Sequence, residues 1–261
     1  MTSTISNKDL YSGIEFSTWL DLQKLWPQEE YLIKKYLNPQ LGVVEAGVNG
    51  GRILLNMQEL GFTNLAGFDY VPELIAEAIE RNPDRTIDFQ VQDAIELTYP
   101  DNSLDQIVYL QQIICLIEDR ASRLRAVRES YRILKPGGIG LFSALSFESR
   151  NSSAIYAVYF KYLKLLRKIR GNDLSIQYLP WLKLGGKFNF NALLDRPPYT
   201  YWYRVTEIYE LLKSVGFEIV GMGTDAQIKA DRLRATDREL CAEEISGMLY
   251  IVVRKKMIDS L

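Results

Sequence analysis

Short apolar segments alternate with helical segments along residues 41–145, and no other feature constrains the fold as much. Their length suits strands better than helices. The predicted strands are 41–48, 65–70, 87–91, 104–110 and 139–145. Strands that alternate with helices form a parallel sheet covered on both faces. We therefore predict an α/β fold with a doubly wound, mostly parallel, seven-stranded sheet.

The chain divides into four predicted parts, and its 261 residues suit one large α/β domain with an elaboration or two smaller domains. The parts are 1–40, one or two amphipathic helices that break near Pro27; 41–145, the α/β core; 146–204, an insertion; and 205–261, which completes the core with a helix at 205–215 and strands at 218–222 and 248–253. The insertion interrupts the alternation, and the family resemblance described below implies that it forms a cap that covers the substrate.

The charge and the apolar pattern exclude several classes of protein. The formal net charge is −2, so the chain as a whole does not attract nucleic acid. Residues 1–21 lack the basic start and unbroken apolar stretch of a signal peptide. No apolar run approaches the ~20 residues that span a bilayer. We expect a cytoplasmic protein with no nucleic-acid partner and no transmembrane segment.

Histidine is absent from the chain. Its absence excludes every Ser-His-Asp and Cys-His nucleophile and removes the commonest transition-metal ligand. The two cysteines, Cys115 and Cys241, are too few for a disulfide framework or a Cys-rich zinc site. We therefore expect no metal site, and any enzymatic chemistry has to proceed without imidazole.

A glycine-rich turn follows the first predicted strand. Residues 43–52 read Val-Val-Glu-Ala-Gly-Val-Asn-Gly-Gly-Arg. Glycine lets a ligand approach the backbone, and the next helix presents free amide groups at its N-terminus. A tight turn without a ligand is the structural alternative, because a glycine-rich turn is a weak signal by itself.

An aspartate, Asp69, lies at the end of the second predicted strand, about twenty residues after the glycine turn. A carboxylate at this strand tip can accept both hydroxyls of a ribose, as in nucleotide-binding α/β domains. The structural alternative is an aspartate that caps the following helix. The spacing from the glycine turn favours the ribose.

Both features also occur in nicotinamide-dependent oxidoreductases. The G-x-G-x-x-G fingerprint of that class, started at Gly47, requires glycines at positions 49 and 52. The chain has Asn49 and Arg52 there. The sequence therefore disfavours a dinucleotide cofactor.

Three further segments complete a series. Residues 92–94, Gln-Asp-Ala, end the third predicted strand; 99–105 precede the fourth; and 132–138, Arg-Ile-Leu-Lys-Pro-Gly-Gly, precede the fifth. In this order and at this spacing, the whole series resembles the class I S-adenosylmethionine-dependent methyltransferases of the type 11/25 kind. The resemblance is strong over residues 40–145 and holds in outline over 205–255.

The resemblance implies which residues surround the methionine part of the cofactor, S-adenosylmethionine. These are Glu45 and Gly47 of the first turn, with Leu110 and Gln111 at the end of the fourth strand. Asn49 replaces the middle glycine of the family motif, and its side chain occupies space near the ligand. Asparagine enters the left-handed backbone region more readily than other residues with side chains, so the turn can be kept.

The resemblance also implies contacts at the adenosine end. Asp69 is expected to hold the ribose hydroxyls and Tyr70 to flank the adenine. Asp93 is expected to accept a hydrogen bond from the adenine amino group, with Ala94 beside it. These positions agree with the rule that ligands bind outside the carboxyl ends of parallel strands.

Methyl transfer suits a chain without histidine. The sulfonium of S-adenosylmethionine activates the methyl group before the protein acts, so holding a nucleophile in line is the main task. A neutral amine needs little help from a base, whereas a hydroxyl needs more. Glu148 and Asp195 are candidate bases near the ends of the insertion, with ordinary surface charge as the commoner reading.

The insertion is rich in aromatic residues that could enclose a hydrophobic, aromatic or amine substrate. Four lie close together, and we predict that they contact the substrate: Tyr199, Tyr201, Trp202 and Tyr203. The alternative is that they pack a small core. Residues 150–170 carry six basic side chains and no acidic one, with apolar residues at roughly helical spacing. This stretch could contact anionic lipid or an anionic substrate, or form a solvated face over a core stripe.

The function predicted from the sequence is methyl transfer from S-adenosylmethionine to a nitrogen or oxygen of a small molecule, with S-adenosylhomocysteine as the product. The alternative is a catalytically inactive S-adenosylmethionine-binding protein or partner subunit. The sequence leaves open the substrate, the general base and whether the chain forms a homodimer.

Overall fold

The computed structural model describes residues 23–151 and 154–257. The part of the predicted N-terminal helical segment before residue 23 lies outside the described residues. Its described part forms α3 (Pro27–Tyr36), which begins at the predicted break. Pro27 fits this position because the first turn of a helix leaves its amide without a partner.

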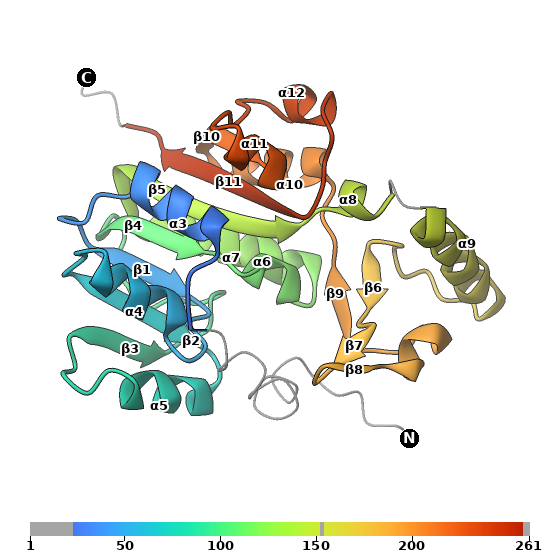
Figure 1. Ribbon diagram of the computed structural model, residues 1–261, viewed down its shortest axis with the longest axis horizontal. Coiled ribbons are helices and arrows are strands. Elements are labelled where there is room, and N and C mark those ends of the chain that lie inside the picture. The colour runs from blue at the N-terminus through green and yellow to red at the C-terminus, as the bar shows by residue number, and fades with distance from the viewer. Residues whose placement is uncertain (1–22, 152–153, 258–261) are drawn as a thin grey trace.

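A seven-stranded sheet forms the centre of the molecule, in the order β10-β11-β5-β4-β1-β2-β3 (Figure 1). Its strands are β1 (Val43–Ala46), β2 (Leu65–Asp69), β3 (Ile87–Val91), β4 (Leu104–Tyr109), β5 (Leu134–Leu145), β10 (Phe217–Gly223) and β11 (Met248–Lys255). Only β11 runs antiparallel to its neighbours in this sheet. The predicted mostly parallel, seven-stranded α/β fold is confirmed.

Helices cover both faces of this sheet, each over its own apolar cluster. One face packs against α7 (Arg120–Ile133), α10 (Val205–Val215) and α12 (Asp237–Cys241). The other face packs against α3, α4 (Arg52–Glu59), α5 (Pro72–Glu80) and α11 (Asp225–Lys229). Neighbouring residues of β1 divide between the clusters, Val43 on one face and Val44 on the other. This alternation is the two-residue period of a strand buried on both sides.

The fifth strand begins earlier than the sequence predicts, because residues 134–138, which were expected to precede it, belong to it. Helix α7 ends at Ile133, and β5 begins at Leu134, so Pro136, Gly137 and Gly138 already belong to the strand. A side chain at position 138 would lie 2.9 Å from the Asp105 carbonyl oxygen. Glycine therefore serves here to bring β5 close to β4, where the strand register shifts.

The insertion 146–204 lies beside the carboxyl ends of β4 and β5 (Figure 1). Its elements are α8 (Phe147–Asn151), α9 (Ala154–Ile169), β6 (Tyr178–Pro180), β7 (Lys183–Leu184), β8 (Lys187–Phe188), the 3-10 helix η1 (Phe190–Leu194) and β9 (Tyr199–Tyr201). A small apolar cluster packs within it, around Phe160 and Leu163. Within residues 23–151 and 154–257, no helix has the length and apolarity needed to cross a membrane.

Candidate functional site

A cavity of about 380 Å³ opens at the carboxyl ends of the central strands. A smaller cavity of about 40 Å³ adjoins it and shares Gly47 and Asn49 of the turn after β1. Together the two are lined by eight of the nine residues that the sequence assigns to a cofactor: Glu45, Gly47, Asn49, Asp69, Tyr70, Asp93, Ala94 and Gln111. The ninth, Leu110, is buried in the apolar core and lines neither cavity.

The turn after β1 leaves the backbone exposed to the cavity. Gly47, Asn49 and Gly51 all have left-handed backbones, with φ of 67°, 53° and 81°. Asn49 therefore takes the conformation that the missing glycine would take. A Cβ atom on Gly47 would lie only 2.3 Å from Cδ1 of Ile113. The glycine thus lets Ile113, which follows β4, pack directly against the turn after β1, where a larger residue would clash.

Asp69 lies at the tip of β2, where its carboxylate accepts backbone amides and also lines the larger cavity. One carboxylate oxygen accepts the Asn49 amide at 3.1 Å, and the other accepts the Val71 amide at 3.0 Å. These bonds hold the glycine turn against the start of α5, and the Tyr70 amide adds a third backbone hydrogen bond to the carboxylate. A carboxylate has about four acceptor sites, so it keeps room for a further donor. Burial raises the pKa of Asp69 to about 6, since water is largely excluded from a side chain that is only 5% exposed.

Three buried oxygen atoms around the smaller cavity have no hydrogen-bond partner among the described residues: Glu45 Oε2, Asn49 Oδ1 and Gln111 Oε1. Buried acceptors without a donor are costly and rare in native proteins. Burial also raises the pKa of Glu45 well above its ordinary value. A small cationic donor such as the ammonium of an amino acid would satisfy all three, so the residues fit the methionine end of S-adenosylmethionine.

A buried ion pair closes the outer side of this smaller cavity. Arg52 donates to both carboxylate oxygens of Glu29, at 2.8 and 2.9 Å, and Glu29 also accepts the amide of Gln111. Glu29 comes from α3, so the N-terminal helix takes part in the site. Sequence reasoning missed this residue, because nothing local distinguishes Glu29 from the other charged residues of an amphipathic helix.

Two consecutive residues after β4, Gln111 and Gln112, have left-handed backbones, with φ of 55° and 58°. This conformation costs energy for a residue with a side chain and concentrates at functional sites. It is held in part by a hydrogen bond from the Gln112 amide to Ser143 Oγ, at 2.9 Å. Gln111 lines the small cavity near β1, whereas Gln112 lines a different cavity in the insertion.

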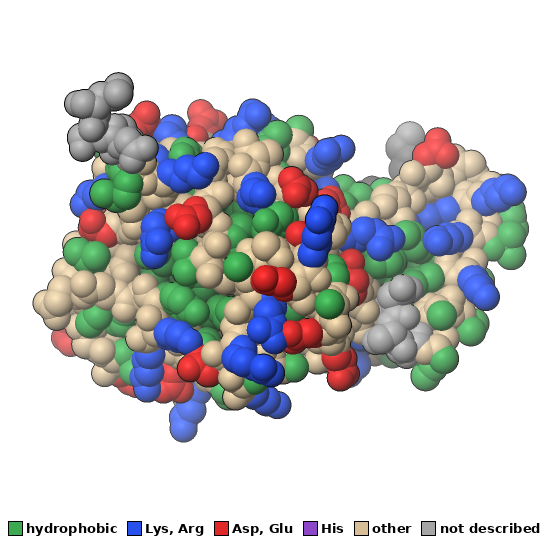
Figure 2. Space-filling view, turned by 90° about the horizontal axis from the view of Figure 1, so that it is seen from above, with side chains coloured by type: hydrophobic (Ala, Val, Ile, Leu, Met, Phe, Trp, Pro, Cys, Tyr) green, Lys and Arg blue, Asp and Glu red, His purple; other side chains and the backbone are tan. Residues whose placement is uncertain are grey.

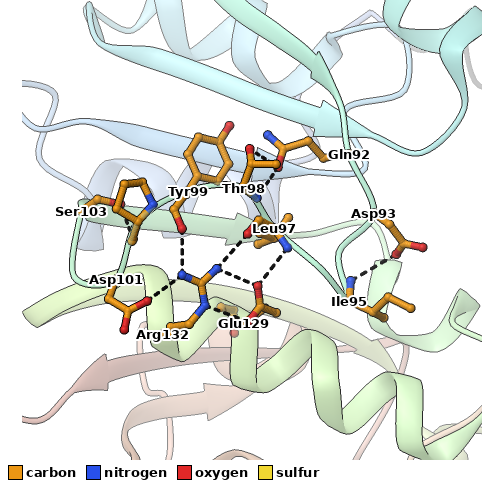
Figure 3. Close-up of polar contacts among 12 residues, drawn as sticks. Gln92, Asp93, Ile95, Leu97, Thr98, Tyr99, Asp101, Ser103, Glu129 and Arg132 are labelled. Atoms are coloured by element: carbon orange, nitrogen blue, oxygen red, sulfur yellow. Dashed lines mark hydrogen bonds and ion pairs between the residues drawn. The ribbon is translucent and has the colours of Figure 1, made fainter.

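Asp93 lies at the exposed rim, where one carboxylate oxygen accepts the amide of Ile95 at 3.1 Å (Figure 3). The loop that carries Asp93 and Ala94 is fixed from below by Arg132. This guanidinium donates to the carbonyl oxygens of Leu97 and Tyr99, at 2.9 and 2.8 Å (Figure 3). Arg132, which the sequence identifies only as part of a motif, therefore positions the loop at the adenine side.

A third cavity, of about 520 Å³, lies between the sheet and the insertion, and we call it the cap cavity. The Arg150 guanidinium lies over the rings of both Tyr156 and Trp202, 4.6 Å from each centroid. Gln112 and Lys183 also line this cavity. None of its lining residues is acidic. The cap cavity thus offers a cation and aromatic faces to an occupant.

The four aromatic residues predicted to contact substrate do not stay together. Trp202 lines the cap cavity. Tyr201 and Tyr203 are buried in the core beneath the sheet, because alternate residues of an extended segment point to opposite sides. Tyr199 is half-buried, and its hydroxyl donates to the carbonyl of Asp195 at 2.6 Å. Tyr201 and Tyr203 therefore pack in a core, which was the alternative to substrate contact.

The two candidate bases both have structural partners. Glu148 accepts the amide of Val205 at 3.3 Å, at the start of α10. Asp195 forms a buried bidentate ion pair with Arg167, with both distances 2.7 Å. Neither residue lines any of the three cavities.

Comparisons with known proteins find a methyltransferase domain in this chain. A family model described as a methyltransferase domain matches residues 44–142. Phosphoethanolamine N-methyltransferase 1 of Arabidopsis thaliana is 30% identical over 135 residues, which cover 51% of this chain and 27% of that protein. The 2-methyl-6-phytyl-1,4-hydroquinone methyltransferase of Synechocystis is 33% identical over 105 residues, 40% of this chain and 31% of that protein. The chain thus spans about a quarter to a third of the length of these relatives.

Solved structures share the fold along most of the chain. A SAM-dependent methyltransferase of Methanosarcina mazei aligns with a TM-score of 0.63 and 19% identity, over 90% of this chain and all of that one. The [4+2]-cyclase SpnF aligns with a TM-score of 0.62 and 17% identity, over 98% of each chain. Residues 44–142 thus match the methyltransferase-domain family, and the sheet and the relatives agree with the class I S-adenosylmethionine-dependent methyltransferase family that the sequence predicts. The predicted family and its cofactor, S-adenosylmethionine, are confirmed.

Proposed function

We propose that the protein transfers the methyl group of S-adenosylmethionine to a nitrogen or oxygen of a small molecule held in the cap cavity. The observation that carries this proposal is the set of three unpartnered buried acceptors, Glu45, Asn49 and Gln111, beside the open turn at Gly47. That combination matches an amino-acid ammonium at one end of the cofactor.

In the proposed complex, Glu45, Asn49 and Gln111 bind the ammonium group of the cofactor. The Asp69 carboxylate accepts hydrogen bonds from the ribose hydroxyls. Tyr70 lies against the adenine, and the free oxygen of Asp93 accepts its amino group, with Ala94 beside it. Arg52 and Glu29 neutralise each other, so the small cavity carries no uncompensated cation that would repel the ammonium.

The protein's main contribution to the reaction is orientation. When bound, S-adenosylmethionine supplies an electrophilic methyl group on a sulfonium. Gln111 lines the small cavity and its neighbour Gln112 lines the cap cavity, so we place the meeting point of donor and acceptor beside this left-handed pair. Alignment of two reactants in this way can lower a barrier by roughly 7–11 kcal/mol.

We propose an acceptor that combines an anionic or aromatic part with a nucleophile that needs no strong base. Arg150, flanked by Tyr156 and Trp202, can bind the anionic or aromatic part. No acidic side chain lines the cap cavity, which favours an amine that arrives neutral. Two relatives, a phosphoethanolamine and a hydroquinone methyltransferase, support a small-molecule acceptor without choosing between an amine and a phenol.

The lack of a carboxylate in the cap cavity also favours a second candidate, an S-adenosylmethionine-binding protein or partner subunit without catalysis of its own. The shared fold of the cyclase SpnF supports keeping this candidate, since fold alone does not determine the reaction.

Calorimetry tests the binding half of the proposal. We expect S-adenosylhomocysteine to bind one site per chain and NAD not to bind. Incubation with methyl-labelled S-adenosylmethionine and a panel of phosphorylated amines, aromatic amines and phenols then tests the transfer. Label in a product supports the enzyme, whereas binding without transfer to any panel member supports the second candidate.

A further inference from the structure

Helix α9 of the cap has one face that packs inward and another that is largely exposed. The inward face carries Phe160 and Leu163, which join Phe147 and Leu179 in the small apolar cluster of the cap. Arg167 continues the same face and forms a buried ion pair with Asp195. The inward face is therefore the main attachment of the helix to the cap.

The outer face of α9 is also apolar. Five residues at intervals of three and four form this stripe, with exposed fractions from 43% for Tyr162 to 80% for Ile155: Ile155, Val158, Tyr162, Leu165 and Ile169. At 3.6 residues per turn they fall within an arc of about 80°. Single exposed apolar residues are ordinary, but a stripe of five on one helix marks an interaction surface.

The stripe continues onto the 3-10 helix beside α9. The Tyr162 hydroxyl donates to the carbonyl oxygen of Leu193 at 2.6 Å, which places η1 next to the stripe. Four more large apolar side chains near η1 are exposed: Phe188, Phe190, Leu193 and Leu194. We call these nine residues of α9, β8 and η1 the cap apolar patch.

The charged side chains that border the patch on α9 are all basic. Lys161, Lys164 and Lys168 border the stripe along one side of α9, and none forms an ion pair with another described residue. Residues 149–172 contain no aspartate or glutamate. The insertion 146–204 has ten lysines and arginines and three acidic residues, a net charge of +7, so the rest of the chain carries −9. Figure 2 shows Lys and Arg side chains gathered on the cap, beside hydrophobic side chains.

We propose that the cap apolar patch and the lysines beside it dock the protein on an anionic membrane surface, with α9 lying in the plane of the interface. An amphipathic helix with an apolar face and a basic border is the form that enters the boundary of headgroups and acyl chains. Anionic lipids attract the lysines while the acidic remainder of the chain is repelled, which orients the cap toward the membrane. A protein partner would have to match an apolar face bordered by cations alone.

Flotation with vesicles tests the docking. The full chain without cofactor is mixed with vesicles of phosphatidylcholine alone or with about one-third phosphatidylserine, at about 0.15 M salt. We expect the protein to float with the anionic vesicles and to stay at the bottom with the neutral ones. The triple variant Ile155→Ser, Leu165→Ser, Ile169→Ser should lose this binding, since each changed side chain is exposed and the fold does not depend on it.

A second variant tests the charges. Lys161→Ala, Lys164→Ala and Lys168→Ala together should weaken binding to the anionic vesicles about 100-fold, at roughly fivefold for each lysine near the surface. The matched control removes three exposed lysines of the α/β core, Lys34, Lys229 and Lys256, and should bind like the wild type.

Three results would overturn the proposal. The first is failure of the wild type to bind anionic vesicles, and the second is equal loss of binding in the control variant. The third comes from analytical ultracentrifugation: a dimer that the triple serine variant converts to monomer would show that the patch joins two copies of the chain. Vesicle binding needs neither cofactor nor acceptor, so the outcome is independent of the proposed methyl transfer.

Discussion

The two regions that flank the pair Gln111–Gln112 are built in different ways. On the β1–β3 side, backbone conformation shapes the site, through the left-handed turn at 47–51 and the strand tips at Asp69 and Asp93. On the cap side, long side chains shape the cavity, mainly Arg150 and the aromatic rings around it. A site shaped by the backbone keeps its shape when side chains are substituted, whereas a site shaped by side chains changes with each substitution. We therefore propose that the first region binds the cofactor, which is the same throughout the family, and that the second binds this chain's own acceptor.

The largest expected effect is a loss of stability in the cap that leaves cofactor binding unchanged. Asp195→Ala leaves Arg167 buried without its partner, which costs roughly 3–5 kcal/mol. We expect denaturant unfolding monitored by tryptophan fluorescence to show early loss of the cap, because Trp181 and Trp202 belong to it. Calorimetry should give an unchanged affinity for S-adenosylhomocysteine. A matching loss of that affinity would show that the two regions are one unit.

The next effect belongs to the cofactor region. Gly47→Ala combines a left-handed backbone with a Cβ atom 2.3 Å from Ile113, so the side chain of Ile113 has to enter the cavity. We expect the affinity for S-adenosylhomocysteine to fall about 100-fold, which is roughly 2.7 kcal/mol. Gly61→Ala is the matched control, since Gly61 also has a positive φ but open space around it. Equal affinities in the two variants would reject the role of Gly47.

A smaller effect should appear only in the cap. Arg150→Ala removes the cation over Tyr156 and Trp202, and we expect the KM for an accepted substrate to rise about tenfold. The affinity for S-adenosylhomocysteine should stay within twofold of the wild type. Arg196→Ala removes an exposed arginine of the cap outside this cavity and should leave both quantities unchanged.

The smallest effect is a pH dependence of the cofactor region. The pKa of Asp69 is raised to about 6, and ribose hydroxyls bind its ionised form better, so affinity should rise with pH and level off above about 7. Between pH 7.5 and 5.5 we expect about a fourfold loss. The chain has no histidine to titrate in this range. Calorimetry on Asp69→Asn should show weaker binding without a midpoint near pH 6; a midpoint kept in that variant would assign the titration elsewhere.

The raised pKa also affects folding. A carboxyl group with a higher pKa in the folded state holds its proton more tightly there, so its contribution to stability is lost as the pH rises from about 4 to about 6. Asp69→Asn should remove this part of the pH dependence of unfolding.

The contrast between the two regions also explains what could be predicted from the sequence. The strands, the turn at Gly47 and the strand-tip residues Asp69 and Asp93 follow from local patterns, because backbone geometry depends on neighbouring residues. Of the two residues predicted at the end of the fourth strand, Gln111 lines the small cavity, whereas Leu110 is buried in the core and lines neither cavity. Whether Leu110 contacts a ligand through its backbone stays a prediction.

Long-range contacts could not be predicted in the same way. Glu29 reaches Arg52 from a helix 23 residues earlier in the chain, and no local pattern marks it. Tyr201 and Tyr203 enter the main core only because the insertion returns to the sheet beside Ser146. In 150–170 the apolar spacing was a true helical signal, but it did not show that Ile155 and Ile169 would face outward.

A crystal structure with S-adenosylhomocysteine tests the central claim most directly. The account predicts the amino-acid end of the ligand against Glu45, Asn49 and Gln111, its ribose on Asp69 and its sulfur directed toward the cap cavity. Density for the ligand outside this cavity, or inside it with the amino-acid end turned away from those three oxygens, would contradict the account.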